Sequence, residues 1–171
     1  MRQVAGVVAM ALVLAGCGGQ EPSAPPPATT TNTTTTTTTP EPDRPATMAD
    51  LAKDPCAALT EDNAAALGVV AGGDEPDPTD PEACSWVAAP TIVMFKAYPA
   101  TDVVPEYAAK PGAVPLTVGG QPATQITVET SCFTHVTVAA SQSFRVAASG
   151  DAGDPCQATV NFATAILANL T

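Results

Sequence analysis

The sequence predicts an α+β fold: an antiparallel β-sheet of about five to six strands, with N- and C-terminal helices packed on one face and two disulfides stapling the domain. Three observations lead to this class. Helix-start signals stand at both ends of the candidate domain, alternating apolar residues with turn signals lie between them, and four of the five cysteines are spread along it. Because the helices and strands fall in separate blocks, the sheet is expected to be antiparallel.

The first 16 residues are typical of a lipoprotein signal peptide. Arg2 supplies a positive charge, residues 4–15 form a short apolar run, and Leu14-Ala15-Gly16-Cys17 matches a bacterial lipobox. A run of about a dozen residues is too short to span a membrane as a stable helix, and an uncleaved anchor is the alternative. We therefore expect Cys17 to carry a thioether-linked diacylglycerol that holds the chain on the extracytoplasmic face of the cell membrane.

Residues 17–46 are predicted to form a lipidated, Thr/Pro-rich, disordered stalk. Residues 29–39 are all threonine except Asn32, and three prolines close the segment. The stalk lacks large apolar side chains that could offset the entropy of ordering it. Its composition fits O-glycosylation, with an unmodified flexible tether as the alternative. The remaining residues, 47–171, are then expected to form a single globular domain.

Two short helices are expected at the start of this domain. In Asp54-Pro55-Cys56 the aspartate is placed to be an N-cap and the proline to occupy the first helical position. Thr60 is placed to cap a second helix over residues 61–67, and Gly68 suits the left-handed position that follows a helix.

A segment with period-two alternation follows and predicts the strands. In residues 132–138, Cys132, Thr134 and Val136 share one face, so His135 is expected on the other. Gly119-Gly120 is typical of a hairpin turn, and residues 102–110 fit a short helix. The strand candidates are residues 83–88, 91–98, 114–118, 123–129, 132–139 and 143–148.

The last helix has the clearest signal. It begins at Asp154-Pro155-Cys156, which repeats the earlier Asp-Pro-Cys motif, with aspartate again placed as the N-cap. Apolar residues then recur at three- and four-residue spacing, namely Cys156, Val160, Ala163, Leu167 and Leu170.

Cys56, Cys84, Cys132 and Cys156 are an even set, which predicts two disulfides in an oxidising compartment. Four cysteines allow three pairings. We favour Cys56 with Cys84 and Cys132 with Cys156, because each pair ties a helix start to a strand close in sequence. The gaps are too long for paired zinc ligands, so neither a metal nor another cofactor is expected.

The composition and the motifs argue against several functions. With a net charge of −11 and six basic residues, the chain lacks the positive surface that nucleic acid requires. There is no G-x-S-x-G nucleophile motif, and the single histidine, His135, is expected on a sheet face, so we expect no catalytic residues and no enzyme activity. A proline-punctuated loop is expected to carry solvated acids, with calcium binding as the alternative: Asp74, Glu75, Asp77, Asp80 and Glu82.

Trp86, Met94 and Tyr98 are the candidate ligand-contacting residues. Trp86 is the only tryptophan and lies two residues after Cys84, and the other two are in the next strand candidate. Together they fit the wall of an apolar pocket. Packing in the core, for Trp86 against a disulfide, is the alternative that we favour.

The chain resembles the actinobacterial lipoproteins that share a cysteine-framed domain of unknown function. The resemblance extends from Asp54 to Leu170 and rests on the order of the lipobox, D-P-C, C-x-W, a further cysteine and a second D-P-C. It implies placement in the cell envelope and two disulfides, and it implies no activity. Cysteine framing and size are also loosely similar to those of extracytoplasmic sensor domains of actinobacterial receptor kinases.

These observations predict a lipid-anchored, monomeric envelope protein with a non-enzymatic recognition or sensor-like function. Its partners are expected to be the membrane, through the lipid on Cys17, and either a small amphipathic or wall-derived ligand or another envelope protein. Binding is expected in a groove between helix and sheet. The alternatives are a lipid carrier between envelope layers, which needs a large apolar cavity, and a cell-wall hydrolase.

Overall fold

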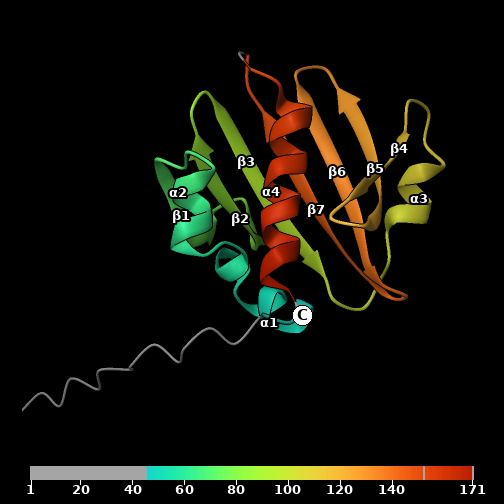
Figure 1. The fold of residues 1–171 in the computed structure, drawn as a ribbon, viewed down its shortest axis with the longest axis horizontal. Helices are drawn as coiled ribbons and strands as arrows, with labels where there is room; N and C mark the ends of the chain where they lie inside the picture. The colour runs from blue at the N-terminus through green and yellow to red at the C-terminus, as the bar shows by residue number, and fades with distance from the viewer. Residues whose placement is uncertain (1–45, 152, 171) are drawn as a thin grey trace, which may run out of the picture. The chain divides into compact units, whose positions relative to one another are not determined.

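A computed structural model describes residues 46–151 and 153–170 and confirms the α+β class (Figure 1). The predictions for the signal peptide, for Cys17 and for the stalk up to residue 45 lie outside the described residues. The described part is a single antiparallel sheet with helices on both of its faces.

The sheet has seven strands in the order β1-β2-β3-β7-β6-β5-β4, one or two more than expected. β1, β2 and β3 form one meander, and β4 to β7 form a second meander that returns β7 to the side of β3. Gly119 and Gly120 have φ values of 55° and 85° and turn between β4 and β5, as predicted. The strands are Ala71–Asp77, Asp80–Ala88, Thr91–Tyr98, Val114–Val118, Gln121–Val128, Ser131–Ala139 and Gln142–Ser149.

The prediction of a loop across the acidic segment was wrong, because most of its residues belong to β1 and β2. β1 is an edge strand with register shifts on both sides of Pro76, and an edge tolerates proline where a central strand does not. The Asp77 carboxylate accepts hydrogen bonds from the backbone N–H groups of Thr79 and Asp80 and so holds the β1–β2 turn. Acidic and proline residues thus build a hairpin here.

The N-terminal region contains one helix that was not predicted, followed by the two short helices that were. Helix α1 (Met48–Lys53) begins with a capping box between Thr47 and Asp50. Asp54 ends this helix and occupies the N-cap position of the next element, the 3₁₀ helix η1 (Pro55–Ala58), as predicted, but its side chain makes no cap hydrogen bond there. Helix α2 (Glu61–Ala66) is capped by Thr60, as predicted.

Helix α4 (Pro155–Asn169) crosses the middle of the sheet and covers one face (Figure 1). Asp154 caps it as predicted, because its carboxylate accepts the N–H of Gln157 at 3.0 Å. Phe162 and Ile166 are buried against the alternate strand residues that face the helix, and the 3₁₀ helix and α1 extend the same layer. The hydrophobic core is therefore formed between α4 and this face.

Both favoured disulfides are present. Cys56 pairs with Cys84 and ties the 3₁₀ helix to β2, and Cys132 pairs with Cys156 and ties β6 to the start of α4. Each joins helix to sheet on the α4 face, so the two bonds fasten the layer that forms the core.

Among the described elements, helix α3 (Val104–Ala108), in the connection from β3 to β4, covers the opposite face of the sheet, and it does so at one end. Tyr107 of α3 stacks on His135, and the Asp102 carboxylate accepts a hydrogen bond from Thr137, which shares a face with His135. Ile92, on the same face but away from α3, is 54% exposed. We call this side the open face, and α3 forms its partial roof.

Candidate functional site

A groove between α3 and the open face is the candidate site. It has a volume of about 260 Å³, slightly below the roughly 300–1,000 Å³ of pockets for drug-sized ligands, which suits a small ligand or one end of a longer one. It lies between helix α3 and the sheet. Its lining residues are Tyr107, Lys110, Ile126, Val128, Phe133, His135 and Arg145.

Strand register brings the groove residues together. Phe133 pairs with Ile126 across β5 and β6, and His135 pairs with Arg145 across β6 and β7. Side chains of directly paired residues lie on the same face of an antiparallel sheet. The alternation that turns Cys132, Thr134 and Val136 toward α4 therefore turns these four side chains toward α3.

His135 is completely buried (0% exposed), and neither ring nitrogen has a hydrogen-bond partner within residues 46–151 and 153–170. Its ring stacks on Tyr107 with the centroids 3.6 Å apart. Burial, together with the positive charges of Arg145 and Lys110, lowers the pKa of His135 from 6.5 to about 4. The imidazole is thus neutral at pH 7, with one N–H donor and one acceptor that no protein group uses, and each such buried group costs about 1–3 kcal/mol of folding stability.

Lys110 lies on the other side of the Tyr107 ring, with its Nζ 3.6 Å from the ring centroid. It also forms an exposed ion pair with Glu106 at 3.4 Å, a type of pair that contributes little to stability in water. The tyrosine ring is therefore held between an ammonium group and a buried imidazole, and a positive charge stands at the mouth of the groove.

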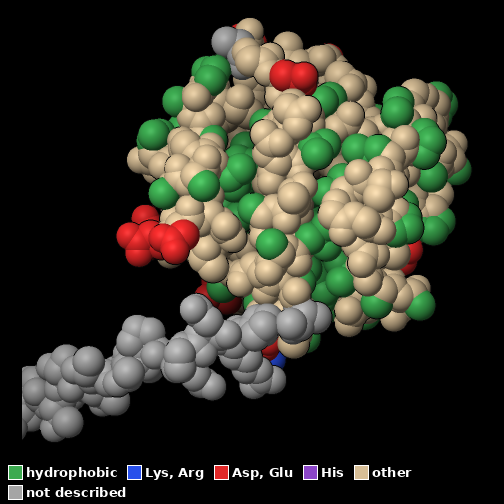
Figure 2. Space-filling model, viewed as in Figure 1, with side chains coloured by type: hydrophobic (Ala, Val, Ile, Leu, Met, Phe, Trp, Pro, Cys, Tyr) green, Lys and Arg blue, Asp and Glu red, His purple; other side chains and the backbone are tan. Residues whose placement is uncertain are grey.

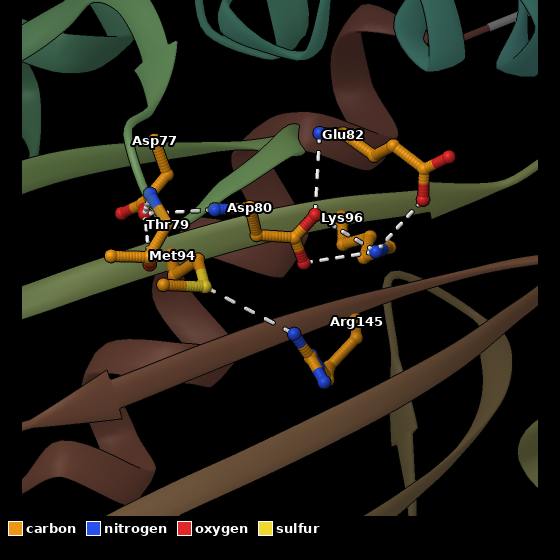
Figure 3. Close-up of polar contacts among 7 residues, drawn as sticks. All are labelled: Asp77, Thr79, Asp80, Glu82, Met94, Lys96 and Arg145. Carbon is orange, nitrogen blue, oxygen red and sulfur yellow. Dashed lines mark hydrogen bonds and ion pairs between the residues drawn. The ribbon is translucent and has the colours of Figure 1, made fainter.

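Arg145 has no carboxylate bound to it in the described residues. Its Nη2 lies 4.0 Å from Met94 Sδ, a weak acceptor, and its Nε is buried without a hydrogen-bond partner. Its cross-strand neighbour Lys96 differs, because the Lys96 Nζ is 2.9 Å from both an Asp80 and a Glu82 oxygen (Figure 3). This pairing raises the pKa of Lys96 and lowers that of Asp80. Two carboxylates thus bind Lys96 directly, whereas in the described residues none binds Arg145, which interacts with Asp80 only at longer range.

Basic residues gather on the open side of the domain. The structure describes four, of which Lys96, Lys110 and Arg145 belong to the open face or its roof and Lys53 ends α1. Viewed from the α4 side, the described surface shows hardly any Lys or Arg, and its acidic side chains lie toward the margins (Figure 2). Three of the four described cations therefore lie on the open side, together with the acids that bind Lys96 and Lys110.

An apolar wall completes the groove. Ile126 and Phe133 are half-buried, and Val128 is 53% exposed although it is a large apolar residue. Apolar side chains beside a few unpaired polar groups are the usual lining of a small-molecule site.

The structure separates the three residues that the sequence singled out. Trp86 is 2% exposed on the α4 face, where its ring lies 6.1 Å from that of Phe162, so its main surroundings are the core. It also borders a cavity of about 410 Å³ between α2 and β1. Met94 and Tyr98 are on the open face, and burial raises the pKa of Tyr98. Met94 contacts Arg145, which lines the groove, and Tyr98 interacts electrostatically with Arg145 and Tyr107.

Most residues of the groove were not predicted. Alternation in the strands placed His135 away from the apolar face, and the same signal holds for Arg145. Tyr107 and Lys110 carried no signal, because nothing in the sequence places a five-residue helix over one particular end of the open face.

Two further searches of the described residues were negative. Within residues 46–151 and 153–170, no helix has the length and apolar content needed to cross a membrane. In the same residues, no group of three His, Cys, Asp or Glu side chains is placed to hold a metal ion.

Comparison with known proteins identifies the family. Neither the curated proteins nor the solved structures contain a match to the chain. One family model matches residues 12–169, nearly the whole sequence. The chain belongs to the family described as Protein of unknown function (DUF3558).

Proposed function

We propose that this protein is a non-enzymatic recognition domain, anchored in the cell envelope by a lipid on Cys17, that binds a small amphipathic ligand in the groove under α3. The observation that carries the proposal is the combination of an apolar wall with three buried nitrogen atoms, both ring nitrogens of His135 and Nε of Arg145, that have no hydrogen-bond partner among the described residues. Buried polar groups normally have hydrogen-bond partners, so buried groups without one call for an explanation. A bound ligand that supplies the missing partner is such an explanation.

Placement outside the cytoplasm is supported by the disulfides. Two are formed in a domain of this size, and disulfides persist mainly in oxidising compartments. In this proposal the signal peptide directs the chain across the membrane, and the lipobox cysteine carries the lipid that anchors it.

The state of His135 supports binding rather than nucleophilic catalysis. A catalytic histidine is normally oriented by one partner and bonded to a nucleophile by its other nitrogen. In the described residues His135 has neither kind of bond, and its low pKa leaves it a weak base.

The proposal is tested by nuclear magnetic resonance with eight-carbon amphiphiles. The protein is the mature chain that the proposed cleavage yields, residues 17–171, with Cys17→Ser to prevent acylation; it retains every described residue. At least one probe among octanoate, octyl phosphate and 1-octanol is expected to shift the His135 Cε1–H resonance saturably. That resonance is unambiguous because the chain has one histidine.

Two variants locate the binding. Phe133→Ala removes part of the groove wall and is expected to weaken binding several-fold. Ile92→Ala removes an exposed apolar side chain from the same face outside the groove and is expected to leave binding unchanged. If no probe gives a saturable shift, or if both variants bind equally well, the groove is not the ligand site.

A further inference from the structure

We infer that the groove selects an anionic amphiphile, with an acidic head group, carboxylate or phosphate ester, on Arg145 and an apolar chain along Ile126, Val128 and Phe133. This inference rests on the proposed function and adds to it the sign and place of the ligand's charge. Three features of the described residues carry it: a guanidinium to which no carboxylate is hydrogen-bonded, a buried neutral imidazole beside it, and an apolar wall that leads away from both.

The contrast between two neighbouring cations is the first step. Lys96 and Arg145 are directly paired across β3 and β7, in a chain with 17 acidic residues. Asp80 and Glu82 both bind Lys96, and Arg145 is left with a thioether contact and a buried unpartnered Nε (Figure 3). A guanidinium presents parallel N–H donors that match the two oxygens of a carboxylate or phosphate. The ligand group that best pairs with the Arg145 guanidinium is therefore an oxyanion.

His135 is the second step. It is fully buried, lines the groove and has two unpartnered nitrogens. The groups facing it are Arg145 from β7, Tyr107 and Lys110 from α3, and the uncharged Thr124 from β5. No acidic residue is among them. Its neutral ring donates one N–H, which an oxyanion on Arg145 can accept, whereas a cationic ligand would meet two positive charges and no carboxylate.

The apolar wall is the third step. Phe133 and Ile126 lie side by side beneath the groove, and Val128 continues the wall toward solvent. A short inorganic anion would leave this wall uncovered, while an alkyl chain removes it from water, and each buried methylene contributes favourably to binding. Head and tail therefore have separate sites that are adjacent.

The test compares probes that share an eight-carbon chain. The two anionic probes are octanoate, which represents a fatty acid, and octyl phosphate, which represents a phosphate ester. They are titrated beside 1-octanol, octyltrimethylammonium and inorganic phosphate. The His135 resonance is the readout. At least one of the two anionic amphiphiles is expected to bind ten-fold or more tightly than 1-octanol and inorganic phosphate, and the ammonium probe is expected to bind most weakly.

Arg145→Gln is expected to bring the affinity for the preferred anion to within about two-fold of that for 1-octanol, and Arg145→Lys to retain part of the preference. Lys53→Gln is the matched control, because it removes one positive charge from the exposed end of α1 and is expected to change the affinity less than two-fold. Lys96 is unsuitable as a control, since its loss would release Asp80, which already interacts electrostatically with Arg145.

The outcomes separate this inference from the proposed function. If 1-octanol binds as tightly as the anions, if the ammonium probe binds best, or if Arg145→Gln keeps the preference, the anion site is refuted while the groove stays a ligand site. If no amphiphile binds, the proposed function itself fails.

A second readout uses octyl sulfate, whose charge does not change between pH 3 and 8. An anion held beside His135 stabilises its protonated form, so saturation with octyl sulfate is expected to raise the pKa of His135 measured from the Cε1–H resonance. A pKa that stays the same or falls upon saturation contradicts an acidic head group at this position.

Discussion

Replacing His135 with phenylalanine should change how the stability of the domain depends on pH. In the folded protein the pKa of His135 is about 4, because the ring is buried and lies near Arg145 and Lys110, whereas in the unfolded chain it is close to 6.5. Between these values the unfolded state binds more protons than the folded state, so stability falls as the pH is lowered. His135→Phe keeps a ring to stack on Tyr107 and removes the titration.

The size of the effect follows from the two pKa values. Above pH 6.5 the folded protein has the full free energy of unfolding that comes from keeping His135 neutral. About 2 kcal/mol of this free energy is lost at pH 5, and about 3 kcal/mol is lost at pH 4 and below. Acidic residues also titrate in this range, but they are common to both proteins and cancel in the difference.

The assay is urea unfolding of the wild type and His135→Phe at pH 7.5 and pH 5, with the disulfides intact. The difference in unfolding free energy between the two proteins is expected to shift by about 2 kcal/mol in favour of the variant at pH 5. Equal pH dependence would refute the claim that His135 is held neutral in the folded state. A direct titration of the Cε1–H resonance checks the midpoint independently.

Three other predictions concern the anchor, a helix cap and a backbone position. Cys17→Ser is expected to move the protein from the membrane fraction to the soluble fraction, and persistence in the membrane would favour an uncleaved anchor. Asp154→Ala is expected to lower the urea-unfolding free energy by about 1 kcal/mol, and Asp54→Ala by less than half of that, because only Asp154 caps a helix with its side chain. Gly73→Ala is expected to lower the thermal unfolding midpoint by more than Gly120→Ala: both positions have positive φ, but only a Cβ at position 73 would overlap an indole ring. Equal midpoints would contradict that packing.

Local patterns predicted most of the fold, for reasons that the structure makes clear. The six predicted strands exist, with β3 and β4 at the expected bounds, because they alternate apolar and polar residues between turn signals. β1 was missed because it is composed of glycine, proline and acidic residues, which strands generally disfavour. Its stability comes from pairing with β2 and from the Asp77 turn, and neither is a property of its own sequence pattern.

The groove was harder to predict than the sheet. Alternation identifies the residues that share a face, and it correctly placed His135 away from the core face. It does not show which part of that face is roofed, because this depends on where the connection between β3 and β4 folds back. Tyr107 reaches His135 only because α3 lies over β5 and β6. The lack of a carboxylate bound to Arg145 also depends on tertiary structure, since Asp80, which interacts with Arg145 at longer range, is hydrogen-bonded to Lys96.

The core and the disulfides lie on one face of the sheet and the unpaired polar groups on the other, which explains how the domain tolerates these groups. The α4 face holds the core and both disulfides, which close loops of 28 and 24 residues and contribute roughly 3 kcal/mol each in the chain-entropy model. The open face carries a buried imidazole and a buried guanidinium nitrogen that lower stability. Because core and groove lie on opposite sides of the same strands, the cross-linked layer keeps the strands in register while the groove side carries these unpaired groups.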